Sequence, residues 1–172
     1  MITFKYARWK NFLSTGNTFT EIQLDRSPTT LIIGENGAGK STILDALCFG
    51  LFGKPFRTIS KNQLVNSVNN SSTSVEVEFT IGTRDYKVIR NIKPNKFEIY
   101  QNDKLMSLEA NVRDYQKILE QQILKLNYRS FTQVVILGSS TFVPFMQLSA
   151  RHRREVVEEI LDIQTVSYTH LR

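Results

Sequence analysis

Cysteine and histidine are almost absent from this chain of 172 residues, which contains one cysteine, Cys48, and two histidines. A single cysteine cannot form an internal disulfide, so the sequence favours a reducing compartment, and we expect a cytoplasmic protein. The isolated His152 and His170 give no metal-ligand spacing with Cys48. The chain also lacks any window with the roughly 18 apolar residues of a membrane span, and it lacks the basic head and apolar core of a signal peptide.

The composition is that of an ordinary globular domain. Apolar residues make up 41% of the chain and charged residues 22%, and the length is sufficient for one domain with its own core. The formal net charge of +6 permits a polyanionic partner but does not require one.

Strands and one helix are predicted in the first third of the chain. Apolar residues alternate with others over residues 2–9, and a second short run covers residues 19–24. The β-branched run Thr29 to Ile33 is typical of a buried strand. From Ser41 to Phe52 the apolar residues follow helical spacing, and Gly53 ends the pattern.

A strand meander followed by helices is predicted in the rest of the chain. Residues 66–74 form a polar loop, after which strand patterns cover residues 75–79, 86–92, 97–100 and 104–106. Asn102 and Asp103 are placed at the turn of the last hairpin. The period then changes to that of a helix over residues 111–126, residues 131–137 form a second buried run, and Ser149 is a good N-cap for a last helix.

The strongest motif is the sequence Gly34-x-x-x-x-Gly39-Lys40-Ser41, which fits the phosphate-binding loop pattern letter for letter. The predicted strand enters it and the predicted helix leaves it, as that motif requires. Glycines let backbone N–H groups turn inward without Cβ clashes and form an anion-binding nest at a helix N-terminus. Lys40 would reach the β- and γ-phosphates, and the Ser41 hydroxyl would coordinate Mg²⁺. We therefore expect ATP and Mg²⁺ as cofactors.

The residues around this loop resemble a known family. Ile33 to Thr42, followed by Ile43 to Leu47 and Phe49 to Gly53, is similar to the N-terminal ATPase lobe of the SbcC-type repair ATPases. These are relatives of the SMC proteins and work on DNA double-strand breaks, and the phage branch with its recombination endonuclease is the most similar. Lys10-Asn-Phe12 resembles the end of the family's first strand, and Ser74 to Phe79 its next strand.

The resemblance implies a mixed α/β P-loop NTPase fold, the N-terminal lobe of an ABC-type ATPase head. It implies that residues 1–148 form this lobe, that residues 149–164 begin a coiled-coil helix, and that residues 165–172 are a truncation junction. It also implies head dimerisation around ATP, an SbcD-type nuclease subunit, double-stranded DNA and a C-terminal lobe of the same protein as partners. The loop pattern and the resemblance together predict the residues that contact the nucleotide, and Lys40 is the catalytic residue among them. The predicted contacts are Gly34, Asn36, Gly37, Ala38, Gly39, Lys40, Ser41 and Thr42.

Two positions depart from the family pattern. An arginine often follows the Asn-Phe pair, where this chain has Leu13. The glutamine that senses Mg²⁺ and the γ-phosphate would fall on Ser139, whereas Gln133 lies nearby in the apolar run. The Mg²⁺-sensing role is therefore open between Gln133 and Ser139, and Gln133 can equally be an ordinary polar residue within a strand.

Two motifs of a complete ATPase are missing. The chain has no run of four apolar residues followed by Asp-Glu, which would supply the carboxylates for Mg²⁺ and water, and no Leu-Ser-Gly-Gly signature. In the resembled family both motifs lie in a C-terminal lobe beyond a long coiled coil. We therefore expect this chain to be half of an ATPase head.

Basic residues cluster in the strand meander and at the last helix. The first cluster predicts either a positive edge for a DNA backbone or a solvated hairpin protected by its charges. The second, residues 151–154, is best explained by ion pairs such as Arg151 with Glu155. The candidate nucleic-acid residues are Arg84, Lys87, Arg90, Lys93 and Lys96.

Three alternatives to a repair ATPase are weaker. A small P-loop kinase needs an arginine-rich lid, where this chain has a strand meander. A non-catalytic DNA-binding scaffold with a relic loop predicts erosion of Lys40 or Ser41, and both are intact. A transporter ATPase lobe shares the loop, but Lys10-Asn-Phe12 and the last helix fit the repair branch better.

Overall fold

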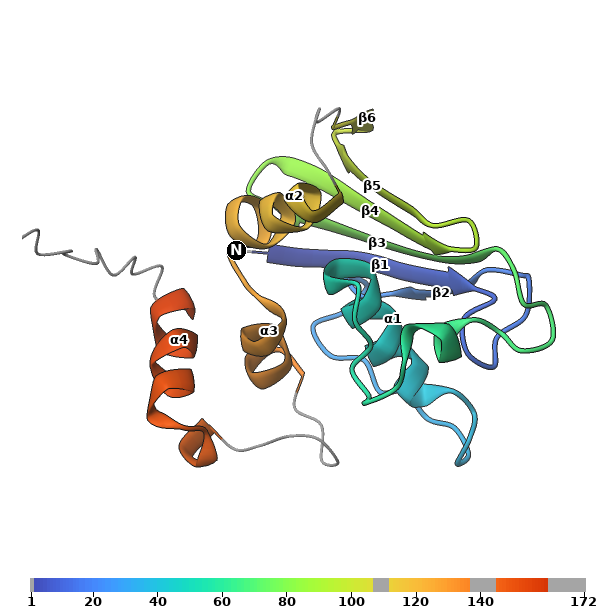
Figure 1. The fold of residues 1–172 in the computed structure, drawn as a ribbon, viewed down its shortest axis with the longest axis horizontal. Helices are drawn as coiled ribbons and strands as arrows, with labels where there is room; N and C mark the ends of the chain where they lie inside the picture. The colour runs from blue at the N-terminus through green and yellow to red at the C-terminus, as the bar shows by residue number, and fades with distance from the viewer. Residues whose placement is uncertain (1, 107–111, 137–144, 161–172) are drawn as a thin grey trace, which may run out of the picture. The chain divides into compact units, whose positions relative to one another are not determined.

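A twisted antiparallel sheet is the framework of the first part of the chain. The computed structural model describes residues 2–106, 112–136 and 145–160. Within these residues six strands form one sheet in the order β2-β1-β3-β4-β5-β6, with every neighbouring pair antiparallel (Figure 1). The strands are β1 (Ile2–Lys10), β2 (Thr20–Gln23), β3 (Thr73–Ile81), β4 (Arg84–Ile92), β5 (Lys96–Gln101) and β6 (Lys104–Leu105). The predicted meander is confirmed, including the turn at Asn102 and Asp103, which both have positive φ.

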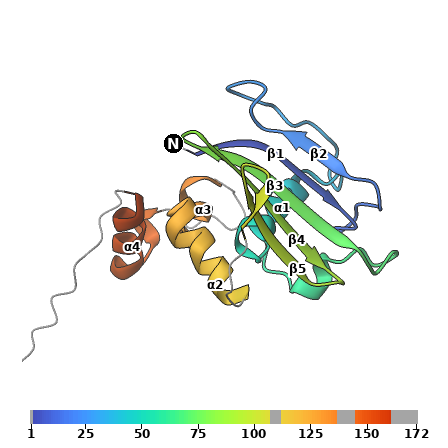
Figure 2. The same ribbon diagram turned by 90° about the horizontal axis from the view of Figure 1, so that it is seen from above.

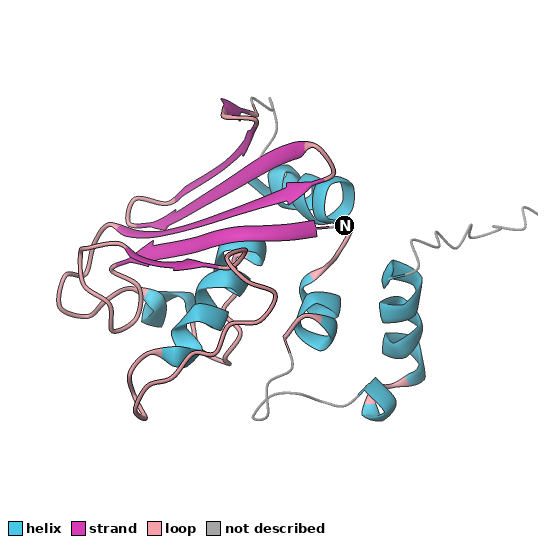
Figure 3. Cartoon of the chain, turned by 180° about the vertical axis from the view of Figure 1, so that it is seen from behind, coloured by secondary structure: helices cyan, strands magenta, loops and turns pink. Residues whose placement is uncertain are grey.

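The helix α1 (Lys40–Phe52) packs against one face of this sheet, over β1, β3 and β4 (Figure 2, Figure 3). It buries Ala46, Cys48 and Phe49 completely. At Gly50 the helix approaches β3 so closely that an added Cβ would lie 2.6 Å from Cγ2 of Val77. Gly53, with φ of 69°, ends the helix as its left-handed C-cap, as predicted.

The two units of the chain are described separately. Contacts divide it into Met1–Tyr115 and Gln116–Arg172. The helix α2 (Val112–Lys117) crosses the boundary between the units. The second unit contains the π-helix η2 (Ile118–Leu124), α3 (Tyr128–Val134), the short 3₁₀ turn η3 (Phe145–Gln147) and α4 (Ala150–Ile160). The division into residues 1–148 and 149–164 stays a prediction, and the tail 165–172 lies outside the described residues.

The expectation of a buried strand at Thr29 to Ile33 is wrong. This segment is irregular, and Leu31 and Ile33 are 81% and 84% exposed. No strand among the described residues pairs with it, so the ladder hydrogen bonds that would fix its backbone do not form. The run is as apolar as a core strand and still lies in water.

Other segments differ from the sequence prediction in smaller ways. The predicted helix over residues 111–126 continues as a π-helix from Ile118, and the buried residues of this π-helix, Leu119 and Leu124, are five positions apart. The run from Phe131 forms the helix α3 rather than a strand, because the Asn127 side chain accepts a hydrogen bond from the Ser130 amide and caps it. Ser149 caps α4, as expected, by accepting from the His152 amide.

The polar loop 66–74 is better packed than its composition predicts. Asn66 is buried, its amide donates to the Leu13 carbonyl (2.9 Å), and its carbonyl oxygen accepts from the amides of Val68 and Asn69. Thr73 and Ser74 are already part of β3 and are buried. None of the described helices has both the length and the apolarity that crossing a membrane requires.

Candidate phosphate-binding site

The glycines of the predicted phosphate loop adopt conformations that other residues rarely adopt. Gly37 and Gly39 have φ of 90° and 89°, and Gly39 is the N-cap of α1. The Ala38 amide donates to the Glu35 carbonyl (3.1 Å), which closes a tight turn in front of the helix. Backbone turned in this way directs N–H groups toward the helix N-terminus and favours an anion there.

Lys40 lies across the same loop. Its ammonium donates to the carbonyls of Gly34 (2.6 Å) and Glu35 (2.7 Å), six and five residues before it. At Gly34 an added Cβ would lie 3.2 Å from the Ala38 Cβ, so the loop leaves little room for a side chain. The positive charge of Lys40 is thereby held at the opening of the nest that the glycines form.

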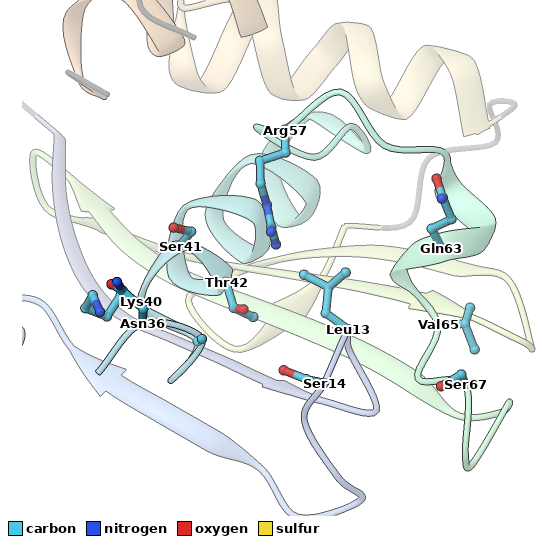
Figure 4. Close-up of a pocket in the computed structure, with 12 residues that line it drawn as sticks. Leu13, Ser14, Asn36, Lys40, Ser41, Thr42, Arg57, Gln63, Val65 and Ser67 are labelled. Carbon is cyan, nitrogen blue, oxygen red and sulfur yellow. The ribbon is translucent and has the colours of Figure 1, made fainter. Parts of the chain in front are cut away.

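A cavity of about 580 Å³ lies beside the loop. Figure 4 shows Asn36, Lys40, Ser41 and Thr42 on one side of it, with Arg57 and Gln63 from the segment that follows α1. Ser41 is exposed and its hydroxyl is available to an ion, whereas Thr42 is buried. The residues lining the cavity are Leu13, Ser14, Asn36, Gly37, Gly39, Lys40, Ser41, Thr42, Arg57, Gln63, Val65 and Ser67.

This residue set fits an Mg²⁺-nucleotide. An anion nest, an ammonium and an exposed hydroxyl are the groups that hold a phosphate chain and its Mg²⁺. Six of the eight predicted contacts line the cavity, and the other two, Gly34 and Ala38, belong to the same loop. Among the described residues that line the cavity, none is acidic.

The wall opposite the loop is built from two segments that hydrogen bonds join. The Leu13 amide donates to the Leu64 carbonyl (2.7 Å), and Phe12 and Val65 form an antiparallel bridge. Leu13 and Val65 supply apolar surface to the cavity. The sequence did not predict this wall. The resemblance at Lys10-Asn-Phe12 was the single signal near it, and residues 63–67 contain no motif.

Arg57 is the second cation of the cavity and was also not predicted as a site residue. It is held by Asp45 of α1, whose side chain is completely buried. The sequence signal for it is that residues 53–57, Gly-Lys-Pro-Phe-Arg, also resemble the phage branch of the family, and this resemblance assigns Arg57 no chemical role.

Neither candidate for the Mg²⁺-sensing residue can be placed at the cavity. Gln133 lies in α3, in the other unit of the chain, and its Oε1 is buried without a hydrogen-bond partner among the described residues. Ser139 lies outside the described residues. The role therefore stays open between the two.

The five basic residues of the meander do not form one positive edge. β4 lies inside the sheet, between β3 and β5, so it is not an edge strand. Arg90 faces α1 and is buried, with its Nε donating to the Gly50 carbonyl (3.1 Å) and its guanidinium 3.8 Å from the Phe97 ring centre. Lys87, three residues away along the strand, lies on the other face over Tyr100. The expectation that Arg90 belongs to a DNA-binding edge is therefore wrong.

Two of the remaining basic residues, Lys93 and Lys96, have polar side-chain partners nearby. Lys93 donates to the Asn70 side chain (2.7 Å), and Lys96 pairs with Glu98 (2.8 Å). Glu98 raises the pKa of Lys96 through that hydrogen bond. Arg84 is exposed at the start of β4. A role in DNA binding for these four residues stays a prediction.

Comparison with known proteins identifies the family. A family model described as an AAA domain matches residues 8–169. The chain belongs to this family. The match includes the loop from Gly34 to Thr42.

The relatives of this AAA domain include, by their names, an exonuclease subunit and a DNA double-strand break repair ATPase. Exonuclease subunit 2 of Enterobacteria phage T4 is 43% identical over 160 residues, which cover 93% of this chain and 28% of the phage protein. The DNA double-strand break repair Rad50 ATPase of Methanococcus maripaludis is 30% identical over 162 residues, which cover 93% of this chain and 16% of that protein. The AAA domain thus spans less than a third of the length of these relatives.

A solved structure supports the fold of the AAA domain. The Smc head domain of Pyrococcus furiosus, solved with an extended coiled coil and bound to a domain of ScpA, matches with a TM-score of 0.67 at 21% identity. The match covers 93% of this chain and 42% of that chain, and at this identity it concerns the fold alone. The predicted mixed α/β head fold and the resemblance to SbcC-type and SMC ATPases are confirmed at this level.

Proposed function

We propose that this chain binds Mg²⁺-ATP in the cavity beside Lys40 and contributes one lobe of an ATPase head. The observation that carries the proposal is the convergence of the left-handed glycines, Lys40 and Ser41 on one cavity. In this assignment Lys40 is the catalytic cation at the phosphates. The Ser41 hydroxyl holds Mg²⁺, a Lewis acid that neutralises the developing charge. Asn36 and Thr42 lie beside them at the same end of the cavity.

The exposed segment Leu31 to Ile33 supports a second lobe as a partner. An apolar run of this kind belongs in the interior of a sheet, and in the described residues it has no partner strand. No described residue that lines the cavity carries a carboxylate, which ATP hydrolysis needs to position water. A C-terminal lobe of the same protein would both cover the run and supply the carboxylate.

The whole protein is proposed to work on DNA ends. The names of the phage and archaeal relatives support an ATPase subunit of a repair or recombination nuclease. We infer heads that dimerise around ATP, an SbcD-type nuclease subunit controlled by them, and double-stranded DNA as the substrate. The cytoplasm is the compartment that this role implies, and it would be the host cytoplasm if the protein is phage-encoded.

The binding proposal is tested by replacing Lys40 with Ala in the 172-residue chain. Charge-assisted hydrogen bonds contribute about 1.5–3 kcal/mol, so we expect affinity for a fluorescent ATP analogue to fall by about 10- to 100-fold. Lys104→Ala is the matched control, because Lys104 is an exposed lysine of β6 that does not line the cavity. Equal affinity in the Lys40 and Lys104 variants would refute the assignment.

A further inference from the structure

A buried carboxylate holds the arginine of the cavity at three points. Oδ1 of Asp45 accepts from the Arg57 backbone N–H (3.0 Å), and Oδ2 accepts from Nε (2.6 Å) and Nη2 (2.5 Å) of the same residue. The Asp45 side chain is completely buried, whereas the Arg57 side chain is 44% exposed. A planar guanidinium bound through two of its nitrogens by one carboxylate is fixed in orientation as well as in position.

The two residues connect the phosphate loop with the opposite part of the cavity. Asp45 lies in α1 four residues after Ser41, on the helix whose N-terminus forms the phosphate site. Arg57 lies in the segment that follows α1, and Figure 4 shows it directed toward the side of the cavity that holds Ser41 and Thr42. Its Nη1 makes no hydrogen bond with a described residue, and the Arg57 side chain as a whole is 44% exposed.

We propose that Asp45 is a positioning residue that holds Arg57 ready to donate from Nη1 to a phosphate oxygen of the bound nucleotide. This inference rests on the proposed function. A free arginine on a surface loses side-chain freedom when it binds a ligand, and Asp45 removes that freedom before binding. Because the carboxylate is buried and the guanidinium is half exposed, the face of the pair that meets the ligand is positive.

A purely structural role explains the pair less well. Taking a carboxylate out of water is costly, and a buried ion pair is weak evidence for stability because apolar residues of similar size often serve as well. Here the arginine of the pair also lines the same cavity as the phosphate loop. Positioning accounts for both the burial of Asp45 and the exposure of Arg57.

The first test is Asp45→Asn. The amide oxygen of the new side chain can still accept from the Arg57 backbone, but its NH₂ group replaces Oδ2 and meets the Nε and Nη2 donors. The guanidinium is then released without a buried charge being left behind. We expect affinity to fall about tenfold for Mg²⁺-ATP and by the same factor for inorganic tripolyphosphate, measured by displacement of a fluorescent ATP analogue.

A double-mutant cycle separates positioning from structure. Arg57→Gln, which keeps one donor for Asp45, should weaken both ligands to a similar extent. Asp45→Asn should add nothing in that background, because its effect passes through Arg57. Additive losses, or unchanged affinity in the single Asp45 variant, would overturn the proposal.

If Asp45→Asn lowers the melting temperature too far, Arg57→Lys provides the second measurement, since lysine keeps the positive charge and cannot bind the Asp45 carboxylate through two nitrogens. Affinity equal to that of the unaltered chain in Arg57→Lys would equally overturn the proposal.

The outcome distinguishes this inference from the proposed function. If Lys40→Ala leaves nucleotide binding unchanged, the nucleotide assignment itself fails. If Lys40→Ala weakens binding as expected while Asp45→Asn has no effect on either ligand, only the positioning role fails.

Discussion

Arg90 stabilises the junction between α1 and the sheet. Its Nε donates to the Gly50 carbonyl near the end of α1, where a cation also complements the helix dipole. Its guanidinium stacks on the Phe97 ring, and Gly53 leaves room for it, since a Cβ there would lie 3.0 Å from its Nη1. Arg90, which the sequence analysis counted among the candidate DNA-binding residues, therefore makes its contacts within the fold.

Replacing Arg90 with Met should therefore lower the stability of the chain. The substitution keeps the apolar stem and removes the hydrogen bonds and the charge, so we expect a loss of about 1.5–3 kcal/mol. Urea unfolding measures it. Lys87→Met on the same strand is the matched control and should change stability by less than about 0.5 kcal/mol. Similar losses in the two variants would contradict the structural role of Arg90.

The two faces of the strand β4 differ, because one is buried against the core and the other carries charged residues. Tyr86, Val88, Arg90 and Ile92 are buried against α1 and the core. On the opposite face Lys87 lies across from Glu78 of β3, and Glu76 also lies on that face, bound by Arg8 at 2.7 Å. A DNA phosphate would meet these acids together with the bases, so any electrostatic track along this element is partly compensated.

Charge reversal of the exposed β4 bases tests the remaining DNA prediction. Arg84→Glu combined with Lys87→Glu should weaken duplex binding and reduce the salt slope by up to about two, because each phosphate contact contributes about 0.9. Binding to a duplex is measured at several salt concentrations, with Lys104→Glu as a control for overall charge. An unchanged slope would assign this strand to the solvated face of the sheet.

At the scale of the whole molecule, the proposed function assigns to this chain the phosphate-binding half of an ATPase site. Its cavity has the cations and the hydroxyl, whereas the sequence contains no apolar run followed by Asp-Glu and no Leu-Ser-Gly-Gly signature. Positioning and electrostatic stabilisation supply nearly all of the catalysis in phosphoryl transfer. A site without a group that orients water should bind its nucleotide without turning it over.

We accordingly expect the 172-residue chain to bind ATP and to hydrolyse it negligibly. Adding the proposed C-terminal lobe should restore hydrolysis and make its rate rise steeply with protein concentration, because two heads would have to meet. Phosphate release is measured against chain concentration with and without that lobe. Robust turnover by this chain alone, lost in Lys40→Ala, would mean that a complete active site lies within it.

The sequence by itself determined the phosphate loop, the strand meander and the helix α1. These depend on local rules: glycines where φ is positive, alternation with a period of two, and helical spacing that ends at Gly53. The proposed cofactor follows from the same local pattern, because Lys40 and Ser41 come directly after the glycines of the loop in the sequence.

Only the tertiary structure decided which face of an element a side chain uses and what covers an apolar run. Arg90 and Lys87 have the same kind of charge, but strand pairing and the position of α1 place one in the core and the other in solvent. Leu31 to Ile33 has the composition of a core strand and is exposed for want of a partner strand. The Asp45–Arg57 pair joins residues 12 positions apart across a bend of the chain, and no local pattern predicts that contact. Such features depend on packing between segments, which residue order does not specify until the fold is formed.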